Sequence, residues 1–137
     1  MVSSPRHLQE PLGGSKQTLG QYLDCHHLEY RVCENINMDG DVISRITLST
    51  LGLSFGAAWI FREQFVNCFG GRLLNLHSTR LPQNRGGGGF SWQILNDNRL
   101  GCCLIHQVDT GVDTGPIVKY ETHAIERSES DYSSSEF

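Results

Sequence analysis

Short helical patterns alternate with extended apolar segments in the first half of this chain, and this alternation constrains the fold more than any other feature. After Thr18, the residues Leu19, Tyr22 and Leu23 follow the i, i+3, i+4 spacing of an amphipathic helix. An extended segment follows at residues 29–33. The sequence therefore predicts a helix and then a strand.

The same step occurs again further along. Asn37 or Asp39 can cap a second helix, whose apolar residues Val42, Ile43 and Ile46 share a face. The run at residues 50–55 then predicts a buried strand.

Phenylalanine recurs at every fourth position, at Phe61, Phe65 and Phe69, which is typical of a helix packed on a sheet. Glycines end that helix, and residues 72–77 are expected to form the next strand. Further strands are predicted at residues 102–108 and 117–120. Parallel neighbours need crossover connections, so the alternation favours an α/β class with a largely parallel sheet.

Length and composition fit one globular domain. The chain has 137 residues, of which 38% are hydrophobic and 19% charged. No apolar run approaches the roughly 20 residues that a membrane-spanning helix needs, and the N-terminus carries no hydrophobic signal region, so a cytoplasmic location is predicted. Residues 1–127 are expected to form the domain and residues 128–137 a polar, disordered tail.

Charge and cysteine usage argue against nucleic-acid and zinc sites. The net charge is −4, and the basic residues are scattered rather than gathered in the stripe that binds a phosphate backbone. The five cysteines show neither CxxC nor Cys/His ligand spacing. We therefore predict no metal and no RNA-binding surface in this segment.

Asn75 and His77 are the residues best suited to chemistry. Side chains alternate along a strand, so this pair points to one face at the end of the predicted strand. An Asn amide can hold a carbonyl oxygen that gains negative charge, and a His can exchange a proton near neutral pH. A carboxylate would orient the imidazole, and Asp109 and Asp113 are both candidates from the next strand's exit.

Three motifs stand in a fixed order along the chain: Asn-Leu-His-Ser-Thr-Arg-Leu-Pro at residues 75–82, Arg-Gly at residues 85–86, and Val-Asp-Thr-Gly-Val-Asp-Thr-Gly-Pro-Ile at residues 108–117. In this order they resemble the signature of the formyltransferase family that uses 10-formyltetrahydrofolate. The resemblance covers residues 51–119 well and residues 5–46 more loosely. It implies a three-layer, Rossmann-like α/β domain whose first strand–helix unit is missing, so that the chain is truncated at its N-terminus.

The resemblance also assigns roles. Asn75 would bind the formyl oxygen, His77 would be the catalytic histidine, and Asp113 rather than Asp109 would pair with that histidine and order a water. The residues expected to contact the folate are Phe55, Gly56, Ala57, Ala58, Trp59, Phe61, Asp109, Thr110 and Val112. Those expected on the acceptor side are Thr79, Arg80, Arg85, Gly86 and Gly87. Arg80 departs from the usual family pattern.

The resemblance implies formyl transfer from 10-formyltetrahydrofolate to an amine, without a metal. A small-molecule acceptor, such as a sugar nucleotide, is favoured over tRNA, because the downstream RNA-binding domain of the methionyl-tRNA members is not encoded. Two alternatives stay open: hydrolysis of the formyl-folate, and an inactive fragment that at most binds folate. A further possibility is an anion-binding module built on the glycine run at residues 86–89.

Overall fold

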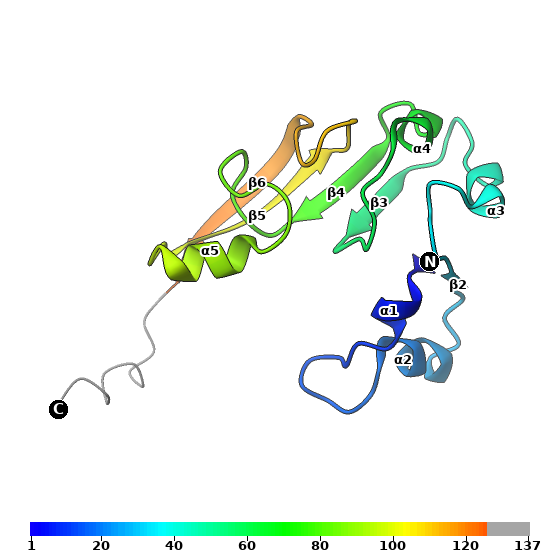
Figure 1. Ribbon diagram of the computed structural model, residues 1–137, viewed down its shortest axis with the longest axis horizontal. Helices are drawn as coiled ribbons and strands as arrows, with labels where there is room; N and C mark the ends of the chain where they lie inside the picture. Colours follow the sequence, from blue (N-terminus) through cyan, green and yellow to red (C-terminus); the bar gives the residue numbers. More distant parts are fainter. Residues whose placement is uncertain (126–137) are drawn as a thin grey trace. The chain divides into compact units, whose positions relative to one another are not determined.

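The computed structural model describes residues 1–125, and the chain divides into two units, Met1–Leu73 and a second that begins at Leu74 (Figure 1). The first unit contains strands β1 (Val2–Ser3), β2 (Arg31–Val32) and β3 (Gly52–Phe55). Its helices are α1 (Pro5–Leu8), α2 (Leu19–Cys25), α3 (Gly40–Ser44) and α4 (Glu63–Cys68). The tail predicted at residues 128–137 lies outside the described residues, and the division at residue 127 stays a prediction.

Helix α2 begins where the sequence predicts. The Oγ1 atom of Thr18 accepts from the Gln21 backbone N–H at 3.3 Å, and the side chain of Gln21 accepts from the Thr18 N–H at 3.0 Å. This reciprocal pair satisfies two N–H groups that the first turn of a helix leaves free. Leu23 is buried, as the amphipathic pattern predicts.

Asp39 caps helix α3 and also pairs with a neighbouring strand. Its Oδ1 atom accepts from the Val42 N–H at 3.0 Å, and its carboxylate receives two hydrogen bonds from Arg31 of β2, at 3.0 and 3.1 Å. The sequence leaves Asn37 and Asp39 open as the cap, and the structure selects Asp39. Helix α3 ends at Ser44, so Ile46 lies beyond it.

The hydrogen bonds from Arg31, followed by the bond from the Val42 N–H, lower the pKa of Asp39 from 3.8 to about 2. A lowered pKa in the folded state stabilises the fold above the unfolded-state pKa, and this stabilisation is lost as the pH falls through the folded value. The variant Asp39→Asn keeps a good cap residue but removes the charge. We expect it to unfold at lower urea than the wild type near neutral pH, with the difference shrinking between about pH 4 and pH 2.

The matched control is Asp41→Asn. Asp41 also contacts Arg31, at 3.1 Å, but its side chain is 73% exposed and caps nothing, so its urea midpoint should move less. Equal shifts in the two variants would contradict the assignment of the stabilising charge to Asp39.

The strand predicted at residues 50–55 forms as β3, but the prediction that it is buried is wrong. Leu53 and Phe55 are 69% and 73% exposed, and Ser54 between them is buried. Alternation therefore puts the large apolar side chains on the open face of β3. The covered face meets the side chains of Phe69 and Leu73 at Gly52.

The phenylalanine helix forms one turn later than its pattern starts. Helix α4 begins at Glu63, so Phe61 precedes it, although the ring of Phe61 stacks on Phe65 at 5.6 Å between centroids. Phe65 and Phe69 are buried, and the glycines that follow adopt positive φ angles. The predicted glycine stop is confirmed.

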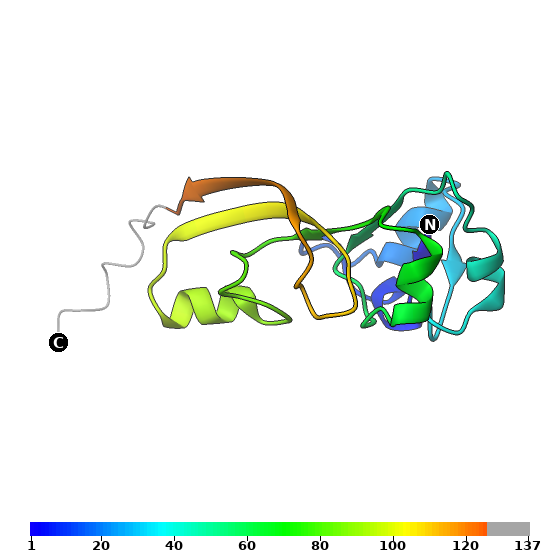
Figure 2. The ribbon, with the colours of Figure 1, turned by 90° about the horizontal axis from the view of Figure 1, so that it is seen from above.

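The second unit is built on antiparallel strands. Strand β4 (Leu73–His77) pairs with β5 (Leu100–Gln107), which pairs with β6 (Ile117–Ala124). Helix α5 (Gly89–Leu95) lies on one face of β5 and β6 (Figure 2), where the buried side chain of Gln93 donates to the Leu100 carbonyl at 2.9 Å. Parallel pairing joins β1 and β2 in the first unit. None of the helices in the described part is long and apolar enough to span a membrane.

Candidate functional site

The candidate site lies in the second unit, and its residues come from the neighbouring strands β4 and β5 and from the loop after β5. Asn75 and His77 point to one face of β4, as alternation predicts. Asn75 stands opposite His106 of β5 in the strand register, and its Nδ2 atom lies 3.2 Å from Nε2 of His106. His106 is 2% exposed, which makes it the most deeply buried large side chain among the described residues.

The loop between β5 and β6 brings Asp113 to this face. A hydrogen bond of 2.9 Å from the Gln107 N–H to the Pro116 carbonyl closes the base of the loop. The Oδ1 atom of Asp113 lies 3.3 Å from Nε2 of His106, and Oδ2 lies 3.7 Å from Nδ1 of His77. The structure thus gathers Asn75, His77 and Asp113 around one additional residue, His106.

Asp109 is the other carboxylate that the spacing allows. Its side chain makes hydrogen bonds within its own loop. Its Oδ1 atom accepts from the Gly111 N–H at 3.0 Å and from the Thr114 hydroxyl. The geometry therefore favours Asp113 as the partner of His77.

Both ring nitrogens of His77 have partners. Nε2 lies 2.9 Å from the Asn84 carbonyl oxygen and 3.0 Å from Oγ1 of Thr79. A carbonyl oxygen only accepts, so Nε2 carries a proton, and Nδ1 is left facing the carboxylate of Asp113. The side chains of His77 and Asp113 are 13% and 15% exposed, so this contact is largely shielded from water. Nε2 thus donates to the Asn84 carbonyl, and Nδ1 faces a carboxylate at an ion-pair distance rather than a hydrogen-bond distance.

The residues expected on the acceptor side lie in different surroundings. Thr79 is 2% exposed and its hydroxyl is engaged by His77 and the Asn84 carbonyl, so it stands behind the imidazole. The Gly86 N–H donates to Oδ2 of Asp113 at 2.7 Å. Arg85 and Gly87 are exposed. Their contacts with an acceptor stay predictions.

Arg80 is half-buried and lies close enough to act on a neighbouring thiol. Burial raises the pKa of the Cys102 thiol, and the guanidinium of Arg80 partly opposes that rise. Its contact with an acceptor stays a prediction.

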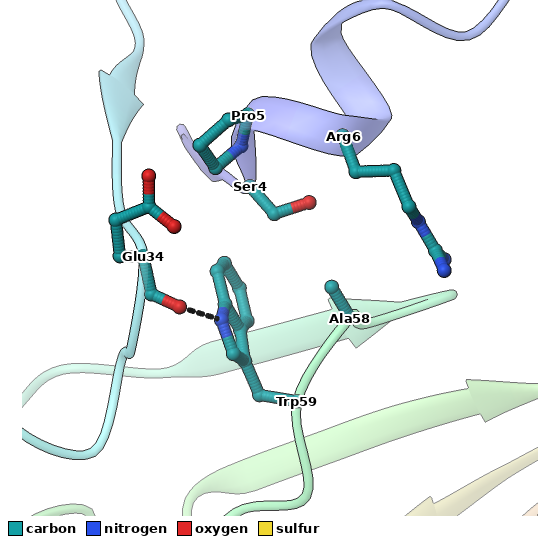
Figure 3. Close-up of a pocket in the computed structure, with 6 residues that line it drawn as sticks. All are labelled: Ser4, Pro5, Arg6, Glu34, Ala58 and Trp59. Carbon is teal, nitrogen blue, oxygen red and sulfur yellow. Dashed lines mark hydrogen bonds between the residues drawn. The ribbon is translucent and has the colours of Figure 1, made fainter.

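The residues expected to contact folate fall in both units. In the first unit, Ala58 and Trp59 line a pocket of about 360 Å³ together with Ser4, Pro5, Arg6 and Glu34 (Figure 3). The Trp59 indole N–H donates to the Glu34 carbonyl at 2.9 Å, which holds the ring at the pocket wall. Phe55 is exposed, and Gly56 has a φ of +55°.

In the second unit, Asp109, Thr110 and Val112 lie on the loop that carries Asp113. Thr110 is exposed, and Val112 is 46% exposed. Their contact with folate stays a prediction.

No sequence pattern singled out His106 as a residue of the site. The signal for its position lay in the alternation of β5, where Cys102, Leu104 and His106 are the buried residues of one face. A histidine in an otherwise apolar row must find polar partners when buried. Without the β4–β5 register, the sequence did not show that these partners are Asn75 and Asp113.

An α/β fold with a shielded amide, imidazole and carboxylate around one point defines a domain suited to a small carbonyl group. Residues 54–135 match the formyl transferase family, and because this match spans more than half of the chain, the chain belongs to that family. The family that the motifs resemble is thereby confirmed.

The curated relatives are formyltransferases with different acceptors in their names. The phosphoribosylglycinamide formyltransferase of Mycobacterium tuberculosis is 37% identical over 68 residues, which is 50% of this chain and 32% of that protein. The methionyl-tRNA formyltransferase of Prochlorococcus marinus is 36% identical over 56 residues, 40% of this chain and 16% of that protein. The chain thus spans less than a third of the length of these relatives.

Solved structures show the same fold. A phosphoribosylglycinamide formyltransferase from Bacillus halodurans superimposes with a TM-score of 0.67 at 21% identity, over 88% of this chain and 64% of that one. A formyltransferase from Anoxybacillus kamchatkensis, in complex with UDP-4,6-dideoxy-4-formamido-L-AltNAc and tetrahydrofolate, gives 0.61 at 25% identity, over 79% and 56%. A formyltetrahydrofolate deformylase from Pseudomonas syringae gives 0.62 at 17% identity, over 78% and 38%. The predicted Rossmann-like α/β class is confirmed.

Proposed function

We propose that this chain carries the catalytic residues for transfer of a formyl group from 10-formyltetrahydrofolate to an amine. The observation that supports this most is the placement of Asp113 against His77 and, through His106, beside Asn75. The donor supplies an activated formyl group when bound. The side chains of this cluster supply positioning and charge stabilisation.

In this proposal each residue has one task. The Asn75 amide N–H stabilises the negative charge that develops on the formyl oxygen as the amine attacks. His77, held in place by the Asn84 carbonyl and the Asp113 carboxylate, adds a second donor as an imidazolium. Asp113 stabilises that charge and orders the water that carries away the amine proton. None of these tasks requires a metal.

The acceptor is proposed to be a small amine, such as an amino sugar on a nucleotide, in line with the sugar nucleotide bound by one similar structure. Phosphoribosylglycinamide and methionyl-tRNA are the alternative acceptors, because relatives are named for them. The net charge of −4 disfavours an extended RNA contact on this chain. A cytoplasmic location suits each of these acceptors and stays a prediction.

Hydrolysis of the formyl-folate is a second candidate, because a deformylase shares the fold. Water would then take the place of the amine beside Asp113. Formate released without any added amine would favour hydrolysis, whereas formylated amine would favour transfer.

The test incubates the full chain with 10-formyltetrahydrofolate and a panel of amines, and follows formylated product and formate by mass spectrometry. Asp113→Asn is expected to lower turnover by about 10²-fold or more, because it removes the charge that holds His77. Glu121→Gln, at a 77% exposed carboxylate on β6 that has no place in the proposed site, should stay within about threefold of the wild type. Binding of a folate analogue without turnover, followed by Trp59 and Trp92 fluorescence, would instead indicate a binding fragment.

A further inference from the structure

His106 is a buried titratable side chain to which the proposed mechanism gives no task. Its Nε2 atom lies 3.2 Å from Nδ2 of Asn75 and 3.3 Å from Oδ1 of Asp113. Its ring stands edge-on to His77 at 6.2 Å between centroids. One nitrogen atom thus contacts two of the three residues that the proposed function uses.

The proton of this ring can be placed from its other contact. The Nδ1 atom lies 2.9 Å from the backbone carbonyl oxygen of Gln107, and a carbonyl oxygen only accepts, so Nδ1 carries a hydrogen. In the neutral imidazole the other nitrogen is then a lone-pair acceptor. The Nδ2 atom of Asn75 is the neighbour able to donate to it.

We propose that His106 is a positioning residue whose Nε2 atom fixes the Asn75 amide, so that one N–H is anchored and the other is aimed at the formyl oxygen. The catalytic consequence rests on the proposed function, but the hydrogen bond itself does not. An amide free to rotate by half a turn would present its oxygen instead of its N–H, and two oxygens would then repel each other at the reacting carbonyl. Anchoring the amide in advance removes that orientation.

The charged and titratable groups around the ring come from the loop and from β4. The Oδ2 atom of Asp113 receives the Gly86 N–H at 2.7 Å and faces Nδ1 of His77 at 3.7 Å, whereas Oδ1 faces Nε2 of His106 at 3.3 Å. From β4, the facing groups are the Asn75 amide and the His77 ring. The competing arrangement is therefore a ring with a second proton on Nε2 that donates to Oδ1 of Asp113, and the experiment below distinguishes it from the proposed one.

The first experiment needs neither turnover nor a substitution. Nitrogen-15 chemical shifts of the His106 ring distinguish a protonated from an unprotonated nitrogen. We expect Nδ1 to be protonated and Nε2 unprotonated near neutral pH, with a hydrogen-bond coupling from the Asn75 side-chain amide to Nε2. A ring protonated at Nε2 would overturn the proposal, because Asn75 would then have nothing to donate to.

The second experiment compares two replacements. A Gln side chain places its amide oxygen near the position of Nε2, whereas an Asn side chain reaches only the position of Nδ1. His106→Gln should keep the Asn75 amide resonance close to its wild-type position and keep kcat within about tenfold. His106→Asn should shift that resonance and lower kcat by about 10²-fold, with KM for the donor changed by less than about threefold.

The two variants also separate positioning from packing. Asn leaves a larger cavity than Gln, so if His106 only filled space, the loss of kcat would follow the loss of Tm in both variants and the Asn75 amide resonance would stay near its wild-type position; that outcome would make the proposal wrong. Wild-type protein that shows the expected ring and amide signals but transfers no formyl group would refute the proposed function while leaving this hydrogen bond in place.

Discussion

The variant His77→Ala is expected to lower formyl transfer by about 10²- to 10⁴-fold, the range found when a general acid–base side chain is removed. The alanine takes away the donor that faces the reacting carbonyl and leaves the carboxylate of Asp113 without its imidazole at 3.7 Å. The loss should fall mainly on kcat, because His77 is not among the residues expected to contact folate. Steady-state kinetics with donor and amine in excess would measure it.

The control for this variant removes an imidazole outside the proposed site. His26 lies at the exposed end of α2, where its ring stacks on Tyr22 at 4.0 Å. His26→Ala should leave transfer unchanged within about threefold. Near-normal kcat in His77→Ala would remove the imidazole from the mechanism.

The second large effect is expected at Gly115, where the loop that carries Asp113 returns to the sheet. A Cβ atom at this position would overlap the backbone carbonyl oxygen of Gln107. Backbone cannot yield as a side chain does, so Gly115→Ala should displace the loop. We expect a loss of about 1–3 kcal/mol in unfolding free energy. A shift of the Asp113 carboxylate by about 1 Å is enough to disturb the site, so formyl transfer should fall by about 10²-fold.

Gly40→Ala is the matched control. A Cβ at Gly40 would meet no atom within 4 Å, and its backbone does not need a positive φ. Urea unfolding and transfer rates should therefore stay near the wild type. If Gly115→Ala behaved like Gly40→Ala, the close return of the loop would not be what holds Asp113.

Local patterns predicted local structure well. Thr18 and Asp39 start helices because their side chains cap N–H groups a few residues away, and such pairs are written in neighbouring sequence. The shared face of Asn75 and His77 follows from alternation alone. The choice of Asp113 over Asp109 came from the family resemblance, and the hydrogen bonds of Asp109 within its turn now give a physical reason for it.

What the sequence did not predict depends on pairing between distant segments. His106 enters the cluster because β5 runs antiparallel to β4 and sets it opposite Asn75, a register that no short pattern encodes. Leu53 and Phe55 suggested a buried strand, but burial depends on which face other elements cover. Hydrophobicity alone could not tell a covered face from an open one.

The backbone of Asp113 has φ +50°, a conformation that disfavours most side chains but that Asp and Asn tolerate. This restricts which acid can evolve at the position. A glutamate tolerates the left-handed backbone less well, and its extra methylene would move the carboxylate away from its present distances of 3.3 and 3.7 Å to the two histidine rings. The backbone conformation of one residue thus limits the length of the acidic side chain. Replacing this aspartate with glutamate would disturb the contacts among Asp113, His77 and His106.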